Sequence, residues 1–166
     1  MGNLLYSDDG LGVAAVQRLQ QGYRFPEEVE LVDGGTLGLE LLRYFEGLDE
    51  LWIVDAVHAG AEPGTLVRLE GDEIPLAFTQ KLSLHQAAVV DLLTAARWLG
   101  IAPSKVVLIG IEPEKTDFGL GLTPAVASQL DVLIGLVAAG FRAQPVSDFT
   151  SEVPVSVGLS ARGSQP

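Results

Sequence analysis

One histidine and three aspartates are the residues whose types and spacing in this sequence could bind a metal. His85 lies in the segment Leu82-Ser83-Leu84-His85-Gln86, where Ser83 and Gln86 have the spacing of a capping box at the start of a helix. The positive end of a helix dipole disfavours an imidazolium ion, so the ring is biased toward the neutral form that binds metals. A histidine that only hydrogen-bonds near the cap is the simpler alternative.

The aspartates stand where a parallel sheet would bring them toward that histidine. Asp8 and Asp9 precede a predicted helix over residues 11–20, and Asp55 follows an apolar run at residues 51–54. Ligands of parallel sheets bind beyond the carboxyl ends of the strands, so all three positions are expected to face one crevice. Capping of a helix or a strand end is the alternative for each acid taken singly.

The elements that must position these residues alternate between strands and helices. Strands are predicted at residues 29–32, 51–54, 65–69 and 106–111, and helices at residues 11–20, 37–48, 84–99 and 124–140. This order predicts an α/β fold, a three-layer αβα sandwich with a mostly parallel central sheet. Residues 1–144 are expected to form one domain, and residues 145–166, rich in Ser, Pro and Gly, a flexible C-terminal tail.

Composition excludes several classes of function. The 166 residues include no cysteine, which excludes a thiol nucleophile, disulfides and Cys-ligated metals. Ten basic against 22 acidic residues give a net charge of −12, so nucleic acid and anionic membranes would be repelled. No apolar run reaches the roughly 18–20 residues that span a bilayer, and no leader pattern follows Met1. The chain is therefore expected to be cytoplasmic, with neither nucleic acid nor membrane as a partner.

Taken together, the motifs resemble those of the nickel–iron hydrogenase maturation proteases, endopeptidases that trim the C-terminus of the hydrogenase large subunit after nickel insertion. The resemblance covers about residues 2–140, and its specificity lies in the order and spacing of the motifs. They are Gly2-Asn3-Leu4-Leu5 with Asp8 and Asp9, Asp33-Gly34-Gly35-Thr36 with Gly38, Asp55-Ala56, Pro63-Gly64-Thr65, Ser83-Leu84-His85-Gln86, Ile109-Gly110-Ile111-Glu112-Pro113 and Leu122-Thr123-Pro124.

The resemblance implies a site as well as an activity. In the family, nickel carried by the substrate contacts an acid of the first loop, an aspartate after a central strand and the histidine of the Ser-x-His-Gln segment. By position these residues are Asp9, Asp55 and His85. The implied partner is the nickel–iron hydrogenase large-subunit precursor. Carboxylate and imidazole ligands also accept other divalent metals, so selectivity for nickel would come from the precursor.

Two departures from the family pattern stand out. The first-loop acid is commonly glutamate, whereas this chain has the shorter Asp9, which leaves open whether Asp8 or Asp9 is the ligand. The family also begins with an apolar strand, which has no counterpart before Gly2 here. The first family strand is therefore expected to be missing from the sheet, and we expect the recorded start to lie downstream of the true one.

The catalytic residues are left unassigned by the sequence. Ser83 and His85 are too close on one turn to act as nucleophile and base, and Ser7 has no evident base. A metal-activated water, or positioning of the precursor by its own nickel, are the two mechanisms that the ligand set allows. A non-enzymatic nickel-dependent binding module, acting as an assembly checkpoint for the precursor, is the alternative function. A nucleotide binder is disfavoured because neither a Gly-x-Gly-x-x-Gly motif nor a P-loop lysine follows a strand.

One further segment has two interpretations. Asp33-Gly34-Gly35-Thr36 is either a strand-to-helix turn or a contact for the substrate peptide, since paired glycines allow a sharp turn and a close backbone approach. We assign it as the candidate substrate-binding segment. The aromatic residues Trp52, Trp98 and Phe118 are expected to pack in the core.

Overall fold

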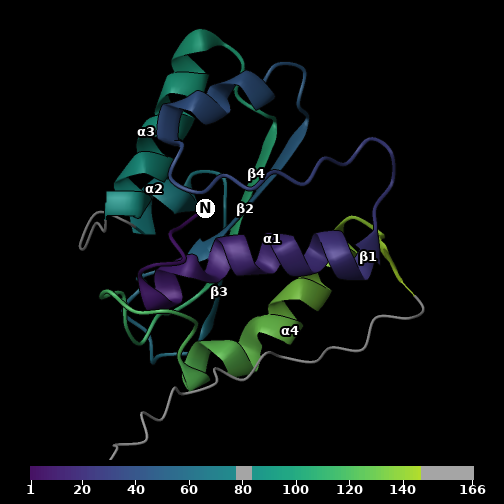
Figure 1. The fold of residues 1–166 in the computed structure, drawn as a ribbon. Coiled ribbons are helices and arrows are strands. Elements are labelled where there is room, and N and C mark those ends of the chain that lie inside the picture. The colour runs from purple at the N-terminus through teal and green to yellow at the C-terminus, as the bar shows by residue number, and fades with distance from the viewer. Residues whose placement is uncertain (78–83, 147–166) are drawn as a thin grey trace, which may run out of the picture.

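The structure is a computed structural model that describes residues 1–77 and 84–146, apart from the side chains of residues 76, 77 and 84–86 (Figure 1). Its elements in chain order are η1 (Ser7–Gly10), α1 (Leu11–Gly22), β1 (Tyr23–Arg24), η2 (Gly38–Tyr44), β2 (Glu50–Ala56), β3 (Leu66–Glu70), α2 (Glu73–Ala77), α3 (Leu84–Leu99), β4 (Lys105–Ile111), α4 (Pro124–Gly140) and β5 (Gln144–Pro145). The η elements are 3-10 helices.

The larger described sheet has the strand order β2-β4-β3. β2 and β4 are parallel, with Asp55 opposite Gly110, whereas β3 is antiparallel to β4. The described sheet is thus mixed, which corrects the expectation of a mostly parallel one. The turn at Pro63-Gly64 brings the chain straight back from the end of β2, so β3 adds to the far edge of β4 in the opposite direction.

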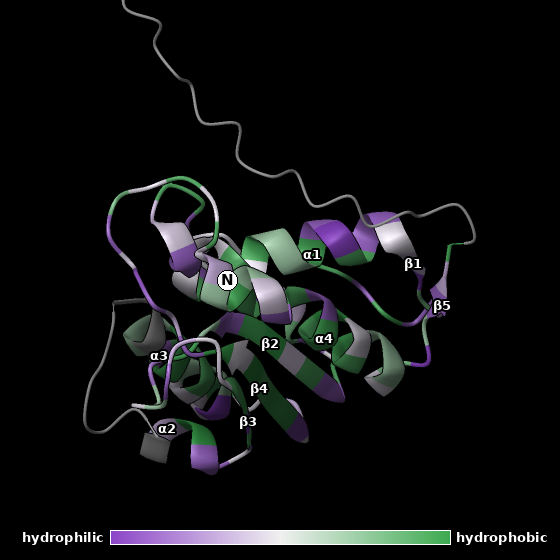
Figure 2. Cartoon of the chain, turned by 90° about the horizontal axis from the view of Figure 1, so that it is seen from below, coloured by the Kyte–Doolittle hydropathy of each residue, from purple (hydrophilic) through white to green (hydrophobic). Residues whose placement is uncertain are grey.

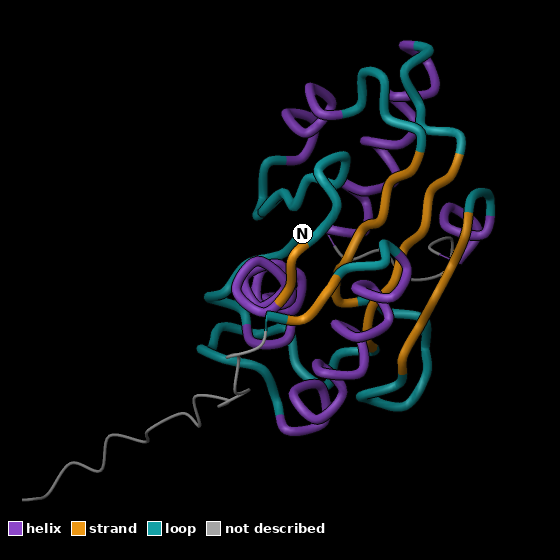
Figure 3. Tube along the Cα trace, turned by 90° about the vertical axis from the view of Figure 1, so that its right-hand side faces the viewer, coloured by secondary structure: helices purple, strands orange, loops and turns teal. Residues whose placement is uncertain are grey.

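Helices cover both faces of this sheet (Figure 3), because successive strand residues point to opposite sides. Ile53 and Leu108 belong to a core cluster that α3, η2 and α2 complete. Their neighbours Val54 and Ile109 belong to a second cluster, formed with α1 and α4. Buried on both faces, β2 and β4 are hydrophobic along most of their length (Figure 2). The α/β fold predicted from the alternation of elements is confirmed.

Most elements match their predictions, and two do not. The helix at residues 84–99 is found as predicted, and those at 11–20 and 124–140 differ by two residues at most. Residues 29–32 are not a strand, although Leu31 and Val32 pack against the core clusters. Alternating apolar residues indicate that one side of a segment is buried. A strand also needs a neighbouring strand with which its backbone can form hydrogen bonds. The helix predicted at residues 37–48 is only the short 3-10 helix η2.

The boundary of the predicted tail also shifts slightly. Pro145 lies in β5, opposite Tyr23 of β1, and the Val146 N–H donates to the Gly22 carbonyl oxygen at 2.9 Å. These backbone bonds attach the first two residues of the predicted tail to the domain. The remainder, residues 147–166, lies outside the described residues.

The aromatic residues divide differently from the prediction. Trp52 packs against Phe141 with ring centroids 5.2 Å apart, as expected for a core residue. Trp98 and Phe118 are largely exposed, so the expectation of core packing is wrong for both. In the part of the chain that the structure describes, no helix is both long and apolar enough to cross a membrane.

Candidate functional site

Asp8 is fully buried and holds the loop that precedes α4 against the turn η1. Its Oδ2 accepts hydrogen bonds from the backbone N–H groups of Glu114 and Lys115, both at 3.0 Å, and from the Thr123 hydroxyl at 2.9 Å. Its Oδ1 accepts from the Thr123 N–H at 2.7 Å. Thr123 is the residue before α4, and its hydroxyl binds Asp8 instead of capping its own helix. Asp8 therefore has a structural role.

Asp9 is the buried neighbour of Asp8, and its carboxylate is turned to a different part of the chain. Its Oδ2 accepts the Asn3 N–H at 3.0 Å, and its backbone carbonyl accepts the same N–H at 3.1 Å. The Asp9 N–H donates to the Tyr6 carbonyl oxygen at 3.1 Å. The tight turn through residues 3–9 thus fixes Asp9 at the entrance to α1.

Asp55 is 1% exposed and lies at the carboxyl end of β2. Its Oδ1 accepts the N–H of Ala56 at 2.9 Å. Gly2 lies close to both this carboxylate and the Asp9 backbone: a Cβ atom on Gly2 would lie 1.8 Å from the Asp9 carbonyl oxygen and 3.5 Å from Asp55 Oδ1. Because Gly2 has no side chain and has a φ of +124°, two buried acids from distant parts of the chain approach the same backbone segment.

His85 is the second residue of α3. α3 and β4 are joined by residues 100–104 and pack together through one core cluster, so they run in opposite directions (Figure 1). The start of α3 therefore lies toward the end of the sheet that carries Asp55. The imidazole of His85 and the capping residue Ser83 lie outside the described part of the structure, so the predicted capping box stays a prediction.

The Asp33–Thr36 segment is a turn that contacts the same region. The Gly35 N–H donates to Asp33 Oδ1 at 3.0 Å, and the Gly35 carbonyl oxygen accepts the N–H of Gly2 at 3.0 Å. The Leu37 N–H donates to the Gly34 carbonyl oxygen, and the chain then enters η2. The segment is thus a turn attached directly to Gly2, and its predicted contact with a substrate peptide stays a prediction.

Glu112 is a buried acid whose role the sequence reasoning did not identify. It follows β4 directly, and its Oε2 accepts the N–H groups of Ala59 at 2.7 Å and Ala61 at 3.1 Å. Its Oε1 lies 3.8 Å from Nδ1 of the half-buried His58. The motif containing Glu112 was visible in the sequence, but only the fold shows that this carboxylate holds the loop after β2 in place.

The described side chains do not by themselves form a metal site. No group of three or more acids, histidines or cysteines among them is arranged to hold a metal ion. The predicted set contains His85, so the described side chains contribute only two of its three members. Asp9 and Asp55 supply oxygen ligands of the kind that divalent metals accept, together with one imidazole when His85 is included.

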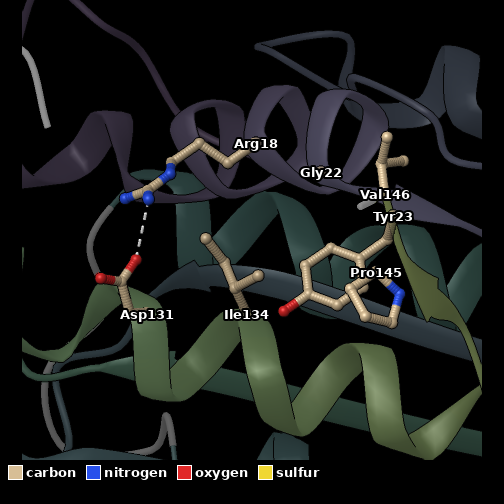
Figure 4. A pocket seen from close by; sticks show the side chains of 7 residues that line it. All are labelled: Arg18, Gly22, Tyr23, Asp131, Ile134, Pro145 and Val146. Carbon is tan, nitrogen blue, oxygen red and sulfur yellow. Dashed lines mark ion pairs between the residues drawn. The ribbon is translucent and has the colours of Figure 1, made fainter. Parts of the chain in front are cut away.

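A separate pocket lies between α1 and α4, at the end of α1 remote from Asp9 (Figure 4). Its volume is about 280 Å³. Arg18 and Asp131 form an ion pair of 2.9 Å at one side of it. The lining residues are Arg18, Gly22, Tyr23, Asp131, Ile134, Pro145 and Val146. α1 is about 18 Å long at 1.5 Å per residue, so this pocket is separate from the candidate site.

Comparisons with known proteins agree with the fold and motifs. The sequence pattern of the hydrogenase maturation protease family matches residues 13–139. The hydrogenase 2 maturation protease of Escherichia coli K12 is 39% identical over 153 residues, which cover 92% of this chain and 93% of that protein. The hydrogenase expression/formation protein HupD of Rhodobacter capsulatus is 41% identical over 145 residues, covering 86% and 69% of the two chains.

A solved structure extends the agreement to three dimensions. The hydrogenase maturating endopeptidase HybD from E. coli superposes with a TM-score of 0.82 at 40% sequence identity, covering 89% of this chain and 95% of that one. The chain therefore belongs to the hydrogenase maturation protease family, and it is a peptidase.

Proposed function

We propose that this peptidase removes the C-terminal peptide of a nickel–iron hydrogenase large-subunit precursor after nickel insertion. In this proposal Asp9, Asp55 and His85 contact the nickel that the precursor carries. The metal belongs to the substrate and marks it as ready for cleavage. Residues Asp33–Thr36 contact the peptide of the precursor beside the metal.

The observation that carries this proposal is the approach of Asp9 and Asp55 at Gly2. Both carboxylates are buried, and carboxylate oxygens are ligands that divalent metals accept. Two buried acids at one backbone segment suit a divalent cation. Asp8 is less suited to be the first ligand, because both of its oxygens already accept hydrogen bonds from the loop before α4.

The ligand chemistry favours recognition of the loaded precursor over capture of free nickel. Carboxylate and imidazole ligands bind several divalent metals, and the usual order of affinities places copper above nickel. Selectivity for nickel is therefore supplied by the precursor. Cleavage limited to the loaded precursor follows from this arrangement, since the nickel-free protein lacks the atom that Asp9, Asp55 and His85 contact.

Intact-mass spectrometry tests the proposal. Precursor with and without nickel is incubated with the unmodified chain, and loss of a C-terminal peptide is expected only from the nickel-loaded sample. His85→Ala and Asp55→Asn should abolish that loss. Asp91→Asn, which changes an exposed acid of α3, is the matched control and should cleave normally.

Two results would contradict parts of the proposal. Full processing by His85→Ala would remove that residue from the recognition site. Binding of the loaded precursor by the unmodified chain without any change in mass would favour the alternative, a non-enzymatic assembly checkpoint.

A further inference from the structure

Two loops beside Asp9 present an exposed apolar surface, which we define as Leu4, Leu5, Tyr6, Phe118 and Leu120. Phe118 is 73% exposed and Leu120 is 79% exposed, while the other three side chains are about half exposed. Large apolar side chains that gather on a surface mark interaction sites more often than apolar residues scattered singly. The residues come from segments more than 100 positions apart, so the fold has brought them together.

Backbone hydrogen bonds join the two loops. The Ser7 N–H donates to the Gly119 carbonyl oxygen at 2.8 Å, and the Gly119 N–H donates to the Leu5 carbonyl oxygen at 2.9 Å. The rings of Tyr6 and Phe118 meet edge to face with centroids 6.2 Å apart. Asp8 adds its hydrogen bonds to Glu114, Lys115 and Thr123 on either side of this contact. A surface held in this way loses little conformational freedom on binding.

The surface is continuous with the candidate recognition site. The carbonyl oxygen of Tyr6 accepts the N–H of Asp9, so the apolar surface and the proposed nickel contact share one hydrogen-bonded turn. A protein that brings its metal to Asp9 must therefore cover or adjoin these side chains.

Charge distribution favours an uncharged contact here. The chain carries a net charge of −12, yet residues 2–7 and 118–121 contain no charged side chain. Interface cores are depleted in charge and enriched in aromatic residues, because charges lose hydration when they are covered. An apolar protein surface is the partner chemistry that fits, with Lys115 and Asp117 at the rim.

We infer that the surface formed by Leu4, Leu5, Tyr6, Phe118 and Leu120 docks an apolar surface of the hydrogenase precursor next to its nickel-bearing segment. This inference rests on the proposed function for the identity of the partner. In this inference the docking surface supplies affinity for the precursor, and the nickel contact distinguishes nickel-loaded from nickel-free precursor. The two contributions can therefore be measured separately.

The test pairs two double variants. Phe118→Ser/Leu120→Ser removes the most exposed side chains of the surface. The control, Trp98→Ser/Leu99→Ser, removes two comparably exposed side chains, 88% and 63% exposed, at the remote end of α3. KM and kcat are measured by release of the C-terminal peptide from nickel-loaded precursor, and affinity is measured separately by biolayer interferometry.

The surface variant should raise KM and the dissociation constant about tenfold with kcat unchanged, as expected when interface anchors are lost. The control should change neither by more than about twofold. Equal effects of the two variants would overturn the inference, as would a fall in kcat alone. Sedimentation velocity tests the rival occupant: dissociation of a dimer in the surface variant would assign the surface to a second copy of this chain.

Failure of the inference and failure of the proposed function are distinguishable. If the unmodified chain binds precursor but does not cleave it, the proposed function fails, while a selective loss of affinity in Phe118→Ser/Leu120→Ser still supports docking. If the unmodified chain cleaves and both variants match it in KM, only the docking surface is refuted. Absence of any binding by the unmodified chain would refute both.

Discussion

Replacing Asp8 by asparagine tests whether one carboxylate holds the loop before α4. Asp8 accepts four hydrogen bonds, three from backbone N–H groups and one from the Thr123 hydroxyl. Asparagine has nearly the same shape, but its amide nitrogen cannot accept a hydrogen bond. At least one of the N–H or O–H groups that bind Asp8 would therefore face the amide N–H of the asparagine. An unsatisfied buried donor costs about 1–3 kcal/mol, and the remaining bonds lose the contribution of the negative charge, about 1 kcal/mol each. These contributions add up to about 4–6 kcal/mol, and because Glu114 and Lys115 are exposed to water we expect a somewhat smaller loss of about 3–5 kcal/mol.

The assay is urea unfolding followed by circular dichroism, with Asp117→Asn as the control for an exposed acid of the same loop. The control should change the free energy of unfolding by less than about 0.5 kcal/mol. Amide hydrogen exchange should also accelerate at Glu114, Lys115 and Thr123 in Asp8→Asn. A double-mutant cycle with Thr123→Val then isolates the hydroxyl contact. A loss below about 1 kcal/mol, with unchanged exchange at these amides, would refute the assignment of Asp8 as the residue that holds the loop.

Two further predictions concern the sheet. Glu50 forms an ion pair of 2.6 Å with Lys105, and this hydrogen bond, followed by that of the Trp52 indole, lowers the pKa of Glu50 from its ordinary value of 4.5. A group whose pKa is lowered in the folded protein contributes stability above its ordinary pKa, and this contribution is lost as the pH falls through the folded-state pKa. Glu50→Gln should therefore cost about 0.5 kcal/mol at pH 7 and less in acid, measured by urea unfolding at pH 7 and pH 3. A cost that grew on acidification would contradict this sign. Gly110→Ala would place a Cβ 2.0 Å from the backbone oxygen of Asp55 and should destabilise by about 4 kcal/mol or more in thermal unfolding. At Gly135 in α4 an added Cβ meets nothing within 4 Å, so the control Gly135→Ala should be neutral or stabilising by up to about 1 kcal/mol. Similar melting temperatures for Gly110→Ala and Gly135→Ala would contradict the steric argument.

The sequence predicted the elements whose local pattern and tertiary environment agree. The run at residues 106–111 is apolar throughout because β4 is buried on both faces, and Gly100 ends α3 with a φ of +70°. The strand predicted at residues 29–32 was wrong because the alternation of apolar residues there reflects burial. A strand also needs a neighbouring strand to pair with, and the periodicity of the sequence does not show one. The prediction that Trp98 and Phe118 pack in the core was wrong for a related reason. The residue type sets how costly exposure to water is, but it does not show which side of an element the side chain lies on.

The places of the candidate ligands in the fold could be predicted in outline, while their role as ligands stays a prediction. The positions of Asp55 and His85 at element ends follow from counting along an α/β pattern. Adjacent acids cannot be distinguished in this way, and only the hydrogen bonds of Asp8 separate its role from that of Asp9. The role of Gly2 was equally hidden, because its importance lies in the atoms that approach it.

The contact between Asp8 and Thr123 also determines when, during synthesis of the chain, the loop before α4 can be fully fixed in place. The two residues are 115 positions apart in the chain. At synthesis rates of about 5–20 residues per second, Thr123 is made roughly 6–23 s after Asp8. The loop that carries Phe118 and Leu120 therefore gains its last two hydrogen bonds to Asp8 only when Thr123 has been made. The proposed docking surface is thus complete only when nearly the whole domain has been translated.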